Sequence, residues 1–214
     1  MKQLIKKEFF LGWKWYNYLF FIFPVMILIP DYPLFTGVLY VFFFVTTLFP
    51  AFLTNNDYKF MSGLPIRRKD IVFSKYFDIL LGQVGTLFLA AIMLLIKVFA
   101  IKETSVPLMD PNFAFVGMTL IEYAVFNLIF MSTYFTELKL PKSILLSLLG
   151  FFISIGILEV LVQVVPPFKI ALDTLDVAYI GWRIGVLAVG AVVYVGGSVL
   201  AFRLACKRFF RYNM

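Results

Sequence analysis

The sequence contains no histidine and a single cysteine, Cys206, among its 214 residues. Without imidazole there is no histidine general base, no histidine-bound metal and no serine–histidine catalytic pair. One thiol excludes an internal disulfide and any site built from several thiolates. The sequence also lacks a Gly-x-x-x-x-Gly-Lys-Ser/Thr loop, so it does not bind a nucleotide by that route. These absences remove most catalytic classes.

Charged residues are scarce as well. They make up 14% of the chain, against about 25% in soluble domains, while hydrophobic residues reach 62% where about 45–50% is usual. A soluble fold of this size could not cover its surface with so few polar side chains. The chain is therefore expected to be an integral membrane protein. Its net charge of +7 then favours positive cytoplasmic loops over a nucleic-acid partner.

Apolar runs long enough for a bilayer core of about 30 Å predict six transmembrane helices. The expected fold class is an all-α integral membrane protein forming one transmembrane domain, 1–214. The predicted spans are residues 16–30, 34–53, 78–101, 112–133, 143–165 and 177–205.

Lysine and arginine residues are distributed unevenly over the segments between these spans. Most lie before the first span, between the second and third, between the fourth and fifth, and after the sixth. The positive-inside rule then predicts that both termini are cytoplasmic. The expected location is the plasma membrane of a bacterial cell.

Residues 1–14 carry an amphipathic pattern, with Leu4, Phe9 and Trp13 on one helical face and most lysines elsewhere. This pattern predicts a helix lying in the cytoplasmic interface, with its lysines near anionic headgroups. Two roles stay open for it: a topology anchor or a docking element for a partner.

Residues 54–77 form the longest polar stretch, and they are expected to lie in the cytoplasm. Pro65 predicts a turn, and the basic residues after it are typical of a helix that continues into the third span. The predicted result is a compact knob on which a soluble partner could push.

The same stretch carries a family resemblance. Asp57, Leu64-Pro65-Ile66, Arg68, Ile71-Val72 and Ser74-Lys75-Tyr76 precede a span, as in the intracellular loop of small type-2 ATP-binding-cassette (ABC) transporter permeases. The whole chain, with its basic amphipathic start and six spans, resembles this family. Within it, the bacterial exporters of phenol-soluble-modulin peptides are similar. At the helix start, members often carry Ser or Thr where this chain has Arg67.

The resemblance implies a role and partners. The chain would be the permease subunit of an exporter, with no catalytic residues and no cofactor of its own. A separate ABC ATPase subunit would bind ATP and Mg²⁺, and a second permease subunit, identical or related, would complete the assembly. The 54–77 loop would be a coupling helix that fits a groove on the ATPase. The residues expected there are Asn55, Asp57, Leu64, Pro65, Arg67, Arg68, Asp70 and Lys75.

Polar residues inside the spans are expensive to bury and need a reason. Glu122 is the deepest acid, and Thr119, Tyr123 and Asn127 on the same helix are possible partners. Its role is either a contact to substrate or a gate, or else helix packing. Towards the other side of the membrane, Glu159 and Arg183 reach similar depths, which predicts an ion pair or, alternatively, snorkelling of Arg183. The candidate pathway or gate residues are Glu122, Asn127, Glu159, Gln163 and Arg183.

Two other functions remain open from the sequence. One is the six-span substrate-binding component of a vitamin importer, which matches in size but would need more polar loops. The other is an intramembrane enzyme, against which the absence of histidine and of adjacent glutamates argues. For the permease, abundant phenylalanine suggests hydrophobic or amphipathic cargo such as peptides.

Overall fold

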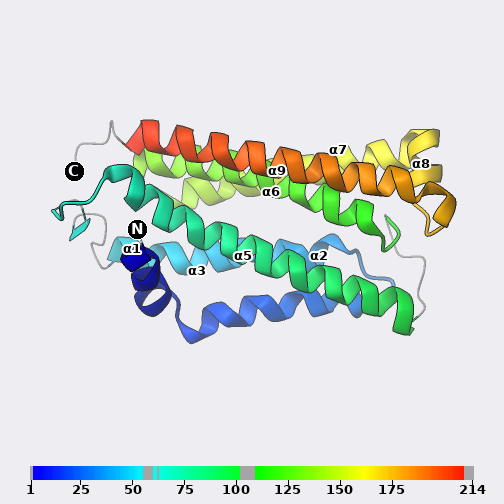
Figure 1. The fold of residues 1–214 in the computed structure, drawn as a ribbon, viewed down its shortest axis with the longest axis horizontal. Helices are drawn as coiled ribbons and strands as arrows, with labels where there is room; N and C mark the ends of the chain where they lie inside the picture. The colour runs from blue at the N-terminus through cyan, green and yellow to red at the C-terminus, as the bar shows by residue number, and fades with distance from the viewer. Residues whose placement is uncertain (1, 55–59, 62, 102–108, 210–214) are drawn as a thin grey trace.

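The computed structural model describes residues 2–54, 60–61, 63–101 and 109–209, and all regular secondary structure in these ranges is helical (Figure 1). The prediction of an all-α protein is confirmed. In chain order the elements are α1 Lys2–Lys7, η1 Glu8–Gly12, η2 Trp15–Leu28, α2 Phe35–Leu39, α3 Val41–Thr54, α5 Arg68–Ile96, η3 Lys97–Ile101, α6 Phe113–Glu137, α7 Leu140–Val164, α8 Pro166–Leu172, η4 Val177–Tyr179 and α9 Ile180–Phe209.

Four helical stretches are long and apolar enough to cross a membrane. They are Arg68–Ile101, Phe113–Glu137, Leu140–Val164 and Val177–Phe209. Each is longer than the roughly 20 residues that a hydrocarbon core requires. The second part of the chain therefore holds candidate membrane-crossing helices, as expected from its composition.

The first part of the chain holds two shorter apolar helical stretches, Trp15–Leu28 and Phe35–Pro50. The 14 residues of η2 form a 3-10 helix, whose rise of about 2.0 Å per residue gives a length of about 28 Å. This tighter winding lets a short segment approach the thickness of the bilayer core. In Figure 1 both stretches run alongside α5. These stretches correspond to the two remaining predicted spans, but they are shorter than the four candidate spans. The count of six spans therefore stays a prediction.

Helix α6 is the central helix of the bundle. Most of its apolar window is buried by its neighbours, whereas only about a fifth of the window is buried in the stretches that contain α5, α7 and α9. Gly117 of α6 and Gly190 of α9 bring two backbones into contact, because a β carbon on Gly117 would lie 2.6 Å from the carbonyl oxygen of Val186. A β carbon on Gly190 would overlap the carbonyl of Gly117. Small residues permit this close crossing.

The two ends of the bundle differ in charge. The end with α1 also holds the start of α5, the α6–α7 turn and the last turn of α9 (Figure 1). We call it the basic end, since Lys6, Arg67, Lys139 and Arg208 lie there. The opposite end, with α8 and η4, is called the far end.

Helix α5 begins at Arg68, shortly after Pro65, as predicted for a helix that continues into the third span, so Asp70 and Lys75 belong to its first turns. One boundary differs from the predicted ones. The N-terminal segment is α1 followed by the wider turns of η1, rather than one regular helix. Leu4, Glu8 and Trp13 are all buried in this arrangement.

Candidate functional site

The predicted coupling residues fall into three groups. Asn55 and Asp57 lie outside the described residues. Leu64, Pro65 and Arg67 are exposed at the basic end, with Arg68 and Asp70 half-buried beside them. Arg67 has extended backbone and precedes the first turn of α5, in which Asp70 is favourably placed for a helix N-terminus. A short apolar and basic surface, Leu64–Arg67, therefore lies directly before the longest continuous α-helix of the first half of the chain.

Lys75, the last predicted coupling residue, points inward instead. Its ammonium lies 2.7 Å from both carboxylate oxygens of Glu8 and 3.3 Å from the centre of the Phe52 ring. Its side chain is fully buried, so it offers no contact to a partner. One turn further along α5, Asp78 accepts a hydrogen bond of 3.1 Å from the indole nitrogen of Trp13. These contacts attach the N-terminal segment to the start of α5.

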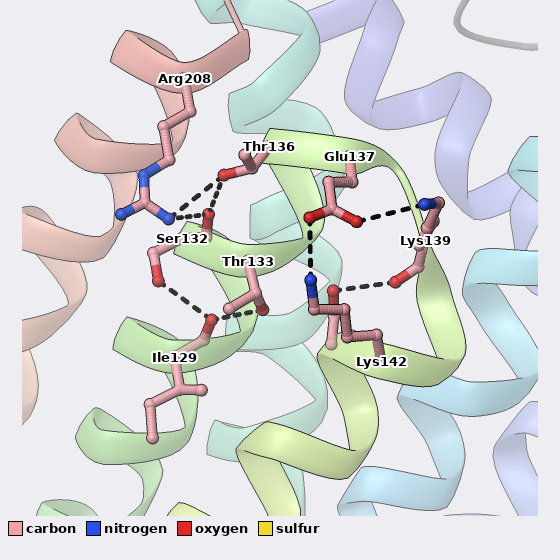
Figure 2. Close-up of polar contacts among 9 residues, drawn as sticks. Ile129, Ser132, Thr133, Thr136, Glu137, Lys139, Lys142 and Arg208 are labelled. Atoms are coloured by element: carbon pink, nitrogen blue, oxygen red, sulfur yellow. Dashed lines mark hydrogen bonds and ion pairs between the residues drawn. The ribbon is translucent and has the colours of Figure 1, made fainter.

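The α6–α7 turn lies at the same end (Figure 2). Leu138 ends α6 in the left-handed region, with φ of 53°. Glu137 lies 2.9 Å from Lys142 and 3.4 Å from Lys139, in exposed ion pairs that add little stability. Figure 2 also shows Arg208 of α9 donating to the Ser132 carbonyl and, at 3.2 Å, to the Thr136 hydroxyl. The end of α9 is thus tied to the end of α6.

A polar network crosses the bundle about halfway along its length. The amides of Gln83 on α5 and Asn127 on α6 exchange two hydrogen bonds of 2.9 Å. Tyr194 of α9 donates to Gln83 at 3.0 Å, and Asn127 lies 3.5 Å from the hydroxyl of Ser198. Of these four residues, only Asn127 is a candidate site residue predicted from the sequence. An isolated amide in the apolar run around Gln83 was the signal that could have identified the second.

Glu122 is fully buried, and neither of its carboxylate oxygens has a hydrogen-bond partner among the described residues. Its predicted partners are engaged elsewhere: Tyr123 donates to the Val38 carbonyl at 3.0 Å and Thr119 to its own helix. The prediction that they serve Glu122 is wrong. Both oxygens of Glu159 on α7 are likewise buried and without a partner in the described ranges.

The predicted ion pair between Glu159 and Arg183 is wrong. Arg183 is 5% exposed, and its guanidinium donates to the carbonyls of Thr174, at 3.1 Å, and of Asp176. Because it satisfies backbone acceptors of the segment between α8 and α9, it neither pairs with the glutamate nor snorkels. Gln163 has a similar far-end role, since it donates to Asp173 at 3.0 Å.

Lys97 lies at the far end, where it contacts the end of η2. Its side chain is fully buried. Its ammonium donates to the carbonyls of Ile27 and Ile29, both at 2.9 Å. These carbonyls lie at the end of η2, where helical backbone acceptors lack internal donors. Lysine therefore caps the 3-10 helix.

The comparison with models of protein families covers nearly the whole chain. A family model described as "ABC-2 family transporter protein" matches residues 3–204. No curated protein and no solved structure matches the sequence. Within the described part of the chain, no three acidic or thiol side chains gather where they could hold a metal ion.

Proposed function

This chain belongs to the ABC-2 family of transporter proteins, and we propose that it is the permease subunit of an exporter driven by a separate ABC ATPase. The match over residues 3–204 carries the proposal. The proposed arrangement has six spans, both termini in the cytoplasm and a location in the bacterial plasma membrane. The concentration of lysine and arginine at the basic end supports this orientation.

The surface at Leu64–Arg67 is the proposed docking site for the ATPase. It is exposed, basic and apolar, and it leads without a break into α5. The 29 residues of α5 extend about 43 Å at 1.5 Å per residue. A push at its first turn is therefore transmitted along one rigid rod to the far end.

Three contacts would pass this movement to the rest of the bundle. The Glu8–Lys75 pair links α5 to the N-terminal segment, and the Gln83–Asn127 amide pair links it to α6. Tyr194 adds α9 to the same network. ATP binding in the partner would thus bias inward- and outward-open states through its differential binding energy, with no catalytic group needed in this chain.

The assembly would contain two permease subunits, identical or related, and two ATPase subunits that bind ATP and Mg²⁺. The proposed cargo is hydrophobic or amphipathic, such as peptides, because the bundle is rich in aromatic side chains. Neither the fold nor the family match supports the two alternative functions, the substrate-binding component of a vitamin importer and the intramembrane enzyme.

Co-purification tests the proposal. The tagged chain, extracted from its native membrane in mild detergent, should bring with it an ABC ATPase identified by mass spectrometry and by vanadate-sensitive ATP hydrolysis. Arg67→Glu should reduce the recovered ATPase several-fold. Lys169→Glu, an exposed charge reversal at the far end, is the matched control and should leave recovery unchanged. Equal recovery of the ATPase with both variants would rule out docking at Leu64–Arg67. If no ATPase co-purifies with the wild-type chain, the proposed function is ruled out.

A further inference from the structure

A short segment between α7 and α9 lies at the far end of the bundle (Figure 1). It consists of α8 and the residues that follow it, and we call residues 166–176 the far-end lid. Helix α7 ends at the extended backbone of Val165, and Pro166 and Pro167 come next. Because proline cannot donate the hydrogen bond that would continue α7, the lid is a separate element from that helix.

Apolar packing holds this lid over a small area. Within α8, Ala171 and Leu172 are buried, whereas residues 166–170 are exposed. Phe168 and Leu172 also line an apolar cavity of about 610 Å³, together with residues of α6, α7 and α9. The lid therefore forms one wall of this cavity while it buries little apolar surface of its own. Segments with few buried apolar contacts open at a low cost in free energy.

Two side chains from outside the lid donate to its backbone carbonyls. Asn112, at the start of α6, donates to Leu172 at 2.6 Å and to Thr174 at 3.2 Å. Arg183, in the first turns of α9, donates to Thr174 at 3.1 Å and to Asp176. Both donor side chains are at most 5% exposed. Buried polar groups of this kind are stable only while they are hydrogen-bonded, so the two donors fasten the lid to α6 and α9.

Asp173 fastens the lid at two further points. One of its carboxylate oxygens accepts from Gln163 of α7 at 3.0 Å, and the other accepts from the backbone nitrogen of Asp110 at 2.9 Å. All of these hydrogen bonds therefore end on five consecutive residues, 172–176. We call this set of contacts the latch. When a latch of hydrogen bonds opens, water can replace each lost partner, which is a requirement for an element that moves repeatedly.

We infer that the far-end lid is the outer gate of the permease, and that Asn112, Gln163 and Arg183 are positioning residues that hold it closed. The gate rests on the proposed function, because the docked ATPase supplies the movement through α5. Helices α6 and α9 cross in close contact, and each carries one of the two buried donors. A movement of this pair relative to α7 draws both donors away from the lid together.

Thiol labelling tests the gate. In a Cys206→Ser chain, Ala171→Cys places a single thiol at a buried position of the lid, where a water-soluble maleimide reaches it only when the lid is lifted. In nanodiscs that contain the chain with its ATPase, addition of ATP should raise the labelling rate at least about tenfold. Lys169→Cys, exposed on the same helix, is the matched control and should label equally with and without ATP. Equal shielding of Ala171→Cys in both conditions would overturn the gate and leave the permease role standing.

A second comparison tests the latch without the ATPase. Arg183→Met removes a hydrogen bond from a charged donor, which should raise the labelling rate of Ala171→Cys about tenfold. Arg208→Met removes the comparable contact of α9 at the basic end and should leave the rate unchanged. Gln163→Leu removes a neutral donor and should give a smaller rise, which decides the matter if Arg183→Met does not fold. Unchanged shielding in the folded variants would overturn the latch, and failure to recover an ATPase would not affect this result.

Discussion

Two sites in this bundle bury glutamate carboxyl groups, and they differ in whether those groups have a partner. At the basic end, Glu8 is enclosed together with Lys75, whose ammonium contacts both of its oxygens at 2.7 Å. In the far half, Glu122 and Glu159 are buried with no donor among the described residues. We call the first site complete because both oxygens of Glu8 are paired within the chain, and this pairing holds two segments together. We call the second incomplete because neither carboxyl group has a donor in the ranges that the structure describes.

The largest effect should come from breaking the complete site. Lys75→Met keeps the length of the side chain but leaves the buried Glu8 carboxylate with only the longer ion pair to Lys7, at 3.7 Å, which should lower the free energy of unfolding by up to about 3–5 kcal/mol. Thermal unfolding in detergent measures the loss. Lys139→Met, at an exposed position, is the control. If adding Glu8→Gln to Lys75→Met recovers none of the stability, the ion pair does not hold the N-terminal segment.

The next largest effect on stability is expected at the crossing of α6 and α9. Gly190→Ala places a β carbon against the carbonyl of Gly117, and such overpacking should cost about 1–3 kcal/mol. Gly196→Ala is matched in helix and in chemistry but meets nothing within 4 Å. It should be neutral or stabilising, because alanine favours a helix over glycine. Thermal unfolding that ranks the two variants the other way round would contradict the described crossing.

A smaller effect is expected for the amide pair between the two sites. Asn127→Leu leaves Gln83 with unsatisfied groups and should cost about 0.6–2 kcal/mol, as for hydrogen bonds between membrane helices. Adding Gln83→Leu should recover part of this loss, because removing both partners leaves fewer unsatisfied polar groups. A double-mutant cycle on thermal stability measures the coupling. Strictly additive losses would show that the two amides do not act as a pair.

The smallest effect on stability is expected at the incomplete site. Glu122→Gln and Glu122→Leu should both fold as well as the wild type, since the carboxyl group makes no hydrogen bond that either change would break. Both should nevertheless alter export or cargo-stimulated ATP hydrolysis in the assembled transporter. Instability of the Leu variant together with normal transport by the Gln variant would assign Glu122 to helix packing.

Hydropathy and charge were sufficient for the coarse architecture. Long apolar runs predict membrane helices from composition alone, and the asymmetric lysines and arginines group at one end of the bundle as expected. The segment Trp15–Leu28 was not predicted in such detail: it winds as a 3-10 helix that contacts α2 and α5 and is capped by Lys97, which is distant in the sequence.

The sequence could not show which polar side chains pair with one another. Depth along a helix suggested that Arg183 faces Glu159, but depth says nothing of the direction around the helix axis, and the arginine turns to nearby carbonyls instead. Lys75 was assigned to the coupling surface through the family resemblance, although a residue 67 positions away pairs with it and its side chain is buried. The family resemblance identified the class of protein, which no cluster of residues in this bundle would have done.

The central claim is that the ATPase docks at Leu64–Arg67. In a Cys206→Ser chain, which has no other thiol, Leu64→Cys is labelled with benzophenone maleimide and irradiated in native membranes. The account predicts a cross-linked product that contains an ABC ATPase, and none when Lys169→Cys is labelled instead. An ATPase cross-linked from Lys169→Cys but not from Leu64→Cys, or from neither, would contradict it.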